Sequence, residues 1–140
     1  MIKHLAALLR QTILNMEKDD FAKSDWFLRF PHGCCGDTSN LLSRFLRDNG
    51  ISTEYVSGFR GNQSHAWLEY DNLIIDITAY QFPEIKEEVL VTRDKSWHDK
   101  FKRQERSDGD FERFESYNRN RLSSMYANIL RKISSKEQVN

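Results

Sequence analysis

The sequence has 140 residues, the size of one typical domain, and 39% of them are hydrophobic, which suffices for one packed core. No apolar run approaches the roughly 18 residues that a transmembrane helix needs, so we expect no membrane partner. Its 21 basic and 21 acidic residues cancel, although residues 1–91 hold 13 acidic against 9 basic and residues 92–140 hold 8 against 12. We interpret the basic half as a solvated helix beside an acidic core, and we do not expect nucleic acid as the partner.

The first 20 residues do not form a convincing secretory signal, because Arg10 and Gln11 interrupt the apolar run and no small-residue cleavage site follows. We therefore expect a cytoplasmic protein. In a reducing compartment a disulfide between the only two cysteines, Cys34 and Cys35, is disfavoured. A bond between neighbours would also constrain almost no chain.

Two helices are predicted before residue 51. Apolar residues recur with a period near 3.6 over residues 2–17, which is typical of an amphipathic helix. Residues 19–35 mix charged and aromatic side chains, so an ordered but irregular segment is expected there. The second helix is predicted from Gly36 to the C-cap pair at Asn49 and Gly50. Its candidate N-cap residues are Asp37, Thr38 and Ser39.

Strands follow in the next part of the chain. Residues 53–59, 65–70 and 73–78 are strand-like, and the last two segments are joined by a predicted two-residue hairpin turn at Asp71 and Asn72. Residues 89–91 are expected to add a short fourth strand.

From Asp94 the chain is charged with a helical pattern and a predicted break at Gly109. One apolar stripe follows: Phe111, Phe114, Leu122, Met125, Ile129 and Ile133. The predicted architecture is therefore α+β in a single domain over residues 1–140. It has a core over residues 26–92 and a helical C-terminal extension over residues 94–136.

A cysteine at the start of a helix is well placed for chemistry, and Cys35 occupies that position. The helix dipole and the backbone N–H groups favour a thiolate there and can also stabilise an oxyanion. An ordinary thiol is mostly protonated at neutral pH, so an adjacent base helps greatly. His65 supplies this base if its strand packs beside the helix start.

An imidazole base needs a partner that fixes its tautomer, and Asp76 is the best candidate. It interrupts the apolar run LIIDIT, where a carboxylate has no packing reason to lie. Pairing across the hairpin turn sets Leu68 near Ile75, so Asp76 falls on the same face of the sheet as His65.

These motifs resemble the transglutaminase-like branch of the papain-fold cysteine enzymes. In that family's pattern a Gly lies two residues before the Cys, a small residue four after it, and Gly-Ile fifteen and sixteen after it. Counted from Cys35, the matching residues are Gly33, Ser39, Gly50 and Ile51, and counting from Cys34 loses this match. The family's His-Ala-Trp-x-Glu and Asp-x-Thr strands match residues 65–69 and 76–78.

The resemblance covers about residues 26–83 and implies a transglutaminase-like core with its nucleophile helix packed on a small antiparallel sheet. It implies Cys35 as nucleophile, His65 as general base and acid, and Asp76 as orienter. The connection from His to Asp is shorter than is usual in the family, which implies a minimal hairpin, and residues after about 84 match nothing in the pattern. The implied chemistry is acyl transfer through a thioester, with hydrolysis of a protein or peptide amide and no cofactor or metal.

Other interpretations stay open. Cys35 alone could be a buried small hydrophobe, and we interpret Cys34 as a packing residue. A metal site from His32, Cys34, Cys35 and His65 is disfavoured, because adjacent cysteines rarely offer both sulfurs to one tetrahedral ion.

Nearby residues receive structural interpretations. Trp67 is expected in the core or as a wall beside His65, and Glu69 in solvent or in a salt bridge. Trp97 and His98 are interpreted as surface residues. In place of hydrolysis, the domain could be an inactive binding or regulatory module, or a transglutaminase-type transferase that acts as an effector.

Overall fold

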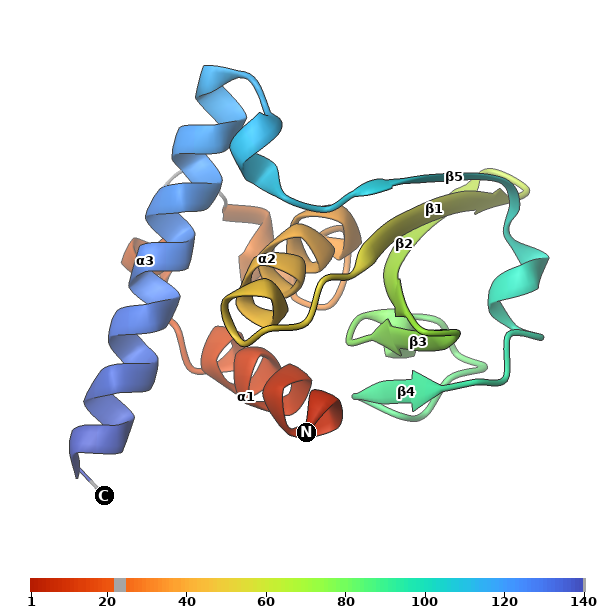
Figure 1. Cartoon of the computed structure of the whole chain (residues 1–140). Coiled ribbons are helices and arrows are strands. Elements are labelled where there is room, and N and C mark those ends of the chain that lie inside the picture. The colour runs from red at the N-terminus through yellow and green to blue at the C-terminus, as the bar shows by residue number, and fades with distance from the viewer. Residues whose placement is uncertain (22–24, 140) are drawn as a thin grey trace.

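The computed structural model describes residues 1–21 and 25–139. It is an α+β fold, as predicted, in which the α-helices lie on one side of a five-stranded antiparallel sheet (Figure 1). Within the described residues, none of the helices is both long and apolar enough to cross a membrane.

Helices α1 (Ile2–Leu14) and α2 (Cys35–Asp48) confirm the two predicted helices. Two short 3-10 helices, η1 (Lys18–Phe21) and η2 (Asp25–Arg29), lie in the irregular segment between them. α2 starts at Cys35, so the predicted N-caps Asp37, Thr38 and Ser39 are wrong and lie within the helix. Gly50 follows the helix with φ +85°, a left-handed conformation that favours glycine.

The sheet has the strand order β4-β3-β2-β1-β5. β1 (Glu54–Arg60), β2 (Gln63–Tyr70) and β3 (Leu73–Asp76) confirm three predicted strands, and β4 (Leu90–Thr92) confirms the fourth. The turn residues Asp71 and Asn72 both have positive φ, as a type I′ hairpin requires. The register pairs Leu68 with Ile75, as expected from the two-residue turn.

The prediction of helix throughout residues 94–136 is wrong in part. Residues Lys102–Asp108 form β5, which pairs with β1 at the edge of the sheet. A 3-10 helix, η4 (His98–Lys100), precedes β5, and another, η5 (Phe111–Arg113), follows it. Helix α3 (Ser116–Val139) then carries most of the predicted apolar stripe into the core.

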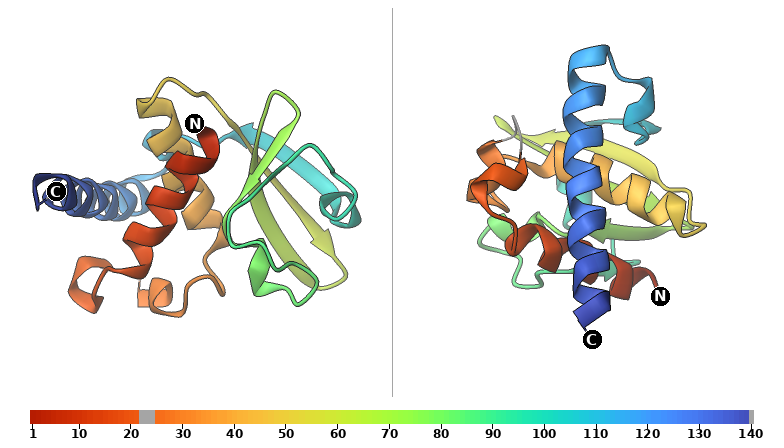
Figure 2. Two further views of the ribbon diagram at one scale, coloured as in Figure 1. Left: turned by 90° about the horizontal axis from the view of Figure 1, so that it is seen from below. Right: turned by 90° about the vertical axis from the view of Figure 1, so that its left-hand side faces the viewer.

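The elements form layers, seen most clearly when the molecule is turned (Figure 2). α2 packs on β1 and β2, α1 packs on α2 and β4, and α3 lies outside both helices. The main core lies between the helices and the sheet, and Leu68 and Ile75 face it. A smaller apolar cluster contains Trp67 and Ile74, which alternate with Leu68 and Ile75 along their strands and so lie on the other face of the sheet.

Candidate active site

Cys35 is the first residue of α2. The preceding residue, Cys34, occupies the N-cap position and makes no side-chain cap hydrogen bond. The backbone N–H groups of the first turn therefore point out of the helix end beside the Cys35 thiol, where they can bind negative charge. The apolar stripe of α2, including Leu41, Leu42 and Leu46, anchors the helix in the core and fixes this end in place.

The two adjacent cysteines have different surroundings, and neither is in a disulfide. The Cys34 side chain is buried in the core, where its sulfur accepts a hydrogen bond from Thr38 Oγ1 at 3.5 Å. Burial raises the pKa of the Cys34 thiol to about 12, so it stays protonated at neutral pH. Cys35 is half-buried and therefore partly open to solvent. The packing interpretation of Cys34 is confirmed.

His65 and Asp76 meet across the β2–β3 hairpin. His65 Nε2 lies 2.7 Å from Asp76 Oδ2, and both side chains are almost fully buried. Burial alone would lower the pKa of His65, but the charge and hydrogen bond of Asp76, together with Cys35, outweigh it and raise this pKa to about 9. The hydrogen bond predicted from the hairpin register is thus present.

Asp76 is held on both of its oxygens. Oδ1 accepts hydrogen bonds from the backbone N–H of Thr78 at 3.0 Å and from its hydroxyl at 3.4 Å, while Oδ2 faces the histidine side. Burial would raise the pKa of Asp76, but hydrogen bonds and charge from His65 and His98 lower it well below the usual aspartate range. A carboxylate with this set of donors remains ionised although it is buried.

The Cys35 thiol lies close enough to His65 to contribute to its raised pKa. Since Asp76 uses Nε2, only Nδ1 of His65 is left for the thiol. Nδ1 is buried and has no hydrogen bond of normal geometry within the described structure. The thiol therefore lies near His65 without a hydrogen bond to Nδ1 in the described structure, and such catalytic hydrogen bonds commonly tighten only when substrate binds.

Aromatic rings enclose the imidazole of His65. The ring centroids of Trp67, Phe82, Trp97 and Phe101 lie 5.2–5.8 Å from that of His65. This confirms the expected wall role of Trp67, whose own side chain is 1% exposed. Apolar walls lower the local dielectric and strengthen the interaction between His65 and Asp76.

His98 was missed as a site residue. It is not on the surface, as expected from its charged sequence context, but 1% exposed, and its Nε2 lies 2.8 Å from Asp76 Oδ2. The surface interpretation fails because η4 turns this residue inward behind Trp97, whose ring lies 4.7 Å from that of His98. The only hint in the sequence was the adjacent bulky aromatic residue.

Tyr55 of β1 was also missed. A Cβ atom at Gly36 would lie 3.2 Å from the Tyr55 hydroxyl, so this hydroxyl sits against the first turn of α2. Burial, and the charges of Cys35 and Asp37, raise the pKa of Tyr55 to about 12, so the phenol remains a hydrogen-bond donor at neutral pH. The sequence contains no motif that would predict this contact between Tyr55 and the helix turn at Gly36.

The cluster of His65, Asp76 and His98 also has the residue types of a metal centre, with donor atoms within 4.8 Å of one another. A metal on both Nε2 atoms would force the ring protons onto Nδ1, and Nδ1 of His98 is buried without a hydrogen-bond partner in the described structure. Such orphaned donors cost about 1–3 kcal/mol each. Hydrogen bonds from the two imidazoles to Asp76 therefore fit these residues better than a bound metal ion does.

The metal site considered from the sequence is not formed. Among the described residues, the set His32, Cys34, Cys35 and His65 does not bring three ligand atoms together, and His32 is exposed.

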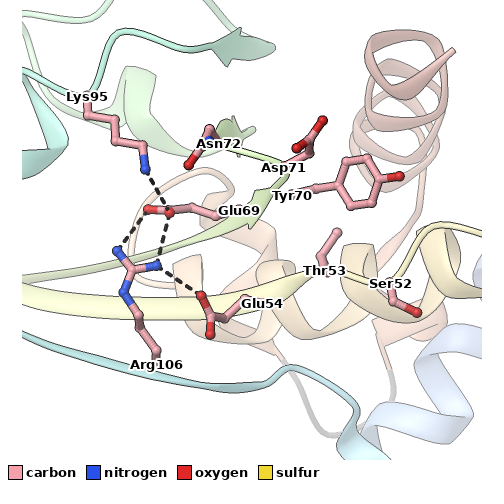
Figure 3. A pocket seen from close by; sticks show the side chains of 9 residues that line it. All are labelled: Ser52, Thr53, Glu54, Glu69, Tyr70, Asp71, Asn72, Lys95 and Arg106. Atoms are coloured by element: carbon pink, nitrogen blue, oxygen red, sulfur yellow. Dashed lines mark hydrogen bonds and ion pairs between the residues drawn. The ribbon is translucent and has the colours of Figure 1, made fainter.

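A polar cavity of about 460 Å³ lies elsewhere, along the far ends of β1 and β2 (Figure 3). None of Cys35, His65 or Asp76 lines it. Its centre is Glu69, which is 8% exposed and bonds Arg106 Nη1 at 3.0 Å, so the salt-bridge interpretation of Glu69 is confirmed. Glu54, Glu69, Lys95 and Arg106 of its lining pair with one another. We therefore interpret the cavity as the place of an ion-pair network that supports the sheet, and not as the reactive centre.

Comparison with known proteins places the chain in a family. The model of the transglutaminase-like superfamily matches residues 3–80. The chain belongs to the transglutaminase-like superfamily. The match starts well before the expected residue 26, so α1 is part of the superfamily domain, and it ends shortly after Asp76. No curated protein and no solved structure matches the chain significantly.

Proposed function

We propose that this transglutaminase-like protein is a cysteine-dependent acyl-transfer enzyme that uses Cys35, His65 and Asp76. The observation that carries the proposal is the buried 2.7 Å bond between His65 and Asp76, formed beside a half-buried thiol at a helix start. The superfamily membership supports the same chemistry. A nucleophile, a base and an orienting group within reach of one another are the elements that this reaction requires.

In the proposed reaction His65 Nδ1 accepts the Cys35 proton, and the thiolate attacks an amide carbonyl. Backbone N–H groups of the first turn of α2 stabilise the oxyanion that forms. When the tetrahedral intermediate collapses, the C–N bond breaks, His65 gives its proton to the leaving amine, and a thioester remains on Cys35. Water, deprotonated by His65, then attacks the thioester, which releases the acid and restores the thiol.

The substrate class we propose is a protein or peptide amide, so the reaction would be that of a protease, an amidase or a deamidase. An amine in place of water would give a transferase through the same intermediate, for example in an effector that modifies another protein. The free cysteines suit a reducing, cytoplasmic setting.

One observation favours a second candidate function, a binding or regulatory module without turnover. The side chain of His65 has no exposed surface, and its Nδ1 has no partner among the described residues. If the thiol never closes onto this nitrogen, Cys35 should react as slowly as an ordinary thiol.

Alkylation separates the two functions. The full chain is incubated with iodoacetamide at pH 7, and adducts are followed by intact-protein mass spectrometry. We expect one rapid adduct on the wild type and on Cys34→Ala, but none at a comparable rate on Cys35→Ala. A wild-type rate equal to that of free glutathione would support the binding module, and first modification of Cys34 would overturn the assignment of the nucleophile.

A further inference from the structure

His98 contacts the orienting carboxylate from outside the part of the chain that the family match covers. It lies on η4, 22 residues after Asp76, and its Nε2 is 2.8 Å from the same oxygen that His65 uses. Asp76 Oδ2 is therefore shared between two imidazoles.

A count of protons shows what each ring does. An imidazole that donates to Asp76 through Nε2 needs its proton on that nitrogen, and a neutral ring has only one N–H. Both rings can donate to Oδ2 at once, and Nδ1 of His98 then keeps a bare lone pair, consistent with the lack of a hydrogen-bond partner for it in the described structure. For His65 the same arrangement leaves Nδ1 to take up the thiol proton, which stays on the ring at neutral pH because the pKa of His65 is raised to about 9.

The position of His98 is fixed by its neighbours. Its ring lies 4.7 Å from those of Trp67 and Trp97, and it is almost fully buried. Gln104 of β5 donates hydrogen bonds to the backbone carbonyl of His98 at 3.2 Å and to that of Phe101 at 3.0 Å. The edge strand thus holds η4 against the site.

We propose that His98 is a positioning residue that donates Nε2–H to Asp76 Oδ2 and thereby keeps this carboxylate aligned with His65. The inference rests on the proposed function, because alignment of His65 matters for catalysis only if His65 serves Cys35. Thr78 anchors the other oxygen, so without His98 the Oδ2 end of the carboxylate would keep His65 as its one hydrogen-bond partner in the described structure.

The charged and titratable groups near His65 come from several elements. Cys35 of α2, Asp76 of β3 and His98 of η4 interact with it or with its partner directly. Beyond the aromatic wall lie Glu69, which accepts a hydrogen bond from Trp67 Nε1, and the ion pair of Arg60 with Glu84, which covers Phe82 and Trp97. A variant at residue 98 leaves all of these other groups in place.

The first measurement uses the unmodified protein. Long-range ¹H–¹⁵N spectra of histidine-labelled wild type report which ring nitrogen carries the proton. We expect His98 to be protonated on Nε2 and bare on Nδ1 at neutral pH. A proton found only on Nδ1 of His98 would overturn the proposal, as would loss of both Nε2–H signals on addition of one equivalent of Zn²⁺, which would assign the cluster to a metal.

The second measurement compares His98→Leu with His98→Gln, whose amide Nε2–H can replace the imidazole donor. The NMR titration midpoint of His65 should fall in His98→Leu and return towards the wild-type value in His98→Gln. The rate of Cys35 alkylation at pH 7 should fall about tenfold in His98→Leu only, the scale expected for an outer partner of a site. A His65 midpoint that is unchanged or raised in His98→Leu, or equal in the two variants, would overturn the proposal.

The NMR readouts do not depend on Cys35. If wild-type Cys35 proves unreactive while the tautomer and midpoint behave as expected, the proposed function fails and the positioning of Asp76 by His98 stands. If Cys35 is reactive and the His65 midpoint does not respond to residue 98, the proposed function stands and the positioning of Asp76 by His98 fails.

Discussion

The proton on His65 links reactivity to stability at the scale of single residues. Because the folded-state pKa of His65 is raised to about 9, above its unfolded value, the pair with Asp76 stabilises the fold fully below about pH 6.5. This contribution is lost as the pH rises through about 9. We expect the free energy of unfolding of the wild type, relative to His65→Gln, to fall by on the order of 3 kcal/mol between pH 6 and pH 10.

Urea unfolding at several pH values measures this difference. Cys34 also destabilises the fold at high pH, because its thiol has a pKa raised to about 12 and ionises more easily when unfolded. That effect is present in both proteins and cancels in the comparison. A difference between wild type and His65→Gln that stays constant from pH 6 to pH 10 would contradict the ion pair.

The meeting of His65 and Asp76 could be predicted from sequence because it depends only on local geometry. A two-residue turn at Asp71 and Asn72 fixes the register of the hairpin, and the register fixes which side chains share a face. His98 could not be predicted in this way. Its contact with Asp76 crosses 22 residues of connecting chain whose path depends on the packing of the aromatic cluster.

At the scale of elements, β5 is the largest departure from the sequence-based prediction. None of its seven residues is hydrophobic, so no alternation marked it as a strand. It is an edge strand, and charged side chains on such strands prevent unwanted pairing with other chains. Its charges find partners on neighbouring strands, notably Arg106 with Glu69 and Glu54 (Figure 3).

The ion pair between β5 and β2 gives an element-scale prediction. Glu69 is nearly buried and also accepts a hydrogen bond from Trp67 Nε1, so removing Arg106 weakens the charge compensation of a carboxylate near the aromatic wall. We expect Arg106→Met to lower the free energy of unfolding by about 1–3 kcal/mol. Thermal and urea unfolding measure the change.

The matched control is Lys102→Met, since Lys102 is an exposed cation on the same strand and should change stability by less than about 0.5 kcal/mol. The double variant Glu69→Gln with Arg106→Met should lose less than the sum of the two single variants. Equal effects of Arg106→Met and Lys102→Met would show that the pair contributes nothing.

For the molecule as a whole, the segment beyond the superfamily match completes the fold. The match ends at residue 80, yet β4, β5 and α3 follow it, together with large side chains that are at most 1% exposed. These include Phe101, Phe111, Leu122 and Ile129. The packed hydrophobic core thus also draws residues from outside 26–92, both from α1 and from the C-terminal part of the chain.

A truncation tests this dependence. A chain of residues 1–92 loses several fully buried side chains worth about 1.5–3 kcal/mol each, which together exceed the usual stability of a domain. We expect no cooperative urea transition and strong binding of a hydrophobic dye, in contrast to the full chain. A cooperative transition in the truncated chain would show that the C-terminal segment is dispensable for folding.

The central claim is that the Cys35 thiol, the His65 imidazole and the Asp76 carboxylate act together. The pH dependence of Cys35 alkylation in wild type, His65→Gln and Asp76→Asn, with folding checked by urea unfolding, tests it most directly. At pH 6 we expect the wild type to react at least about tenfold faster than either folded variant, because His65, whose pKa is raised to about 9, is protonated there and favours the Cys35 thiolate. We expect the three rates to converge near pH 10, where the ring is neutral and an ordinary thiol is ionised. Three superimposable profiles would contradict it.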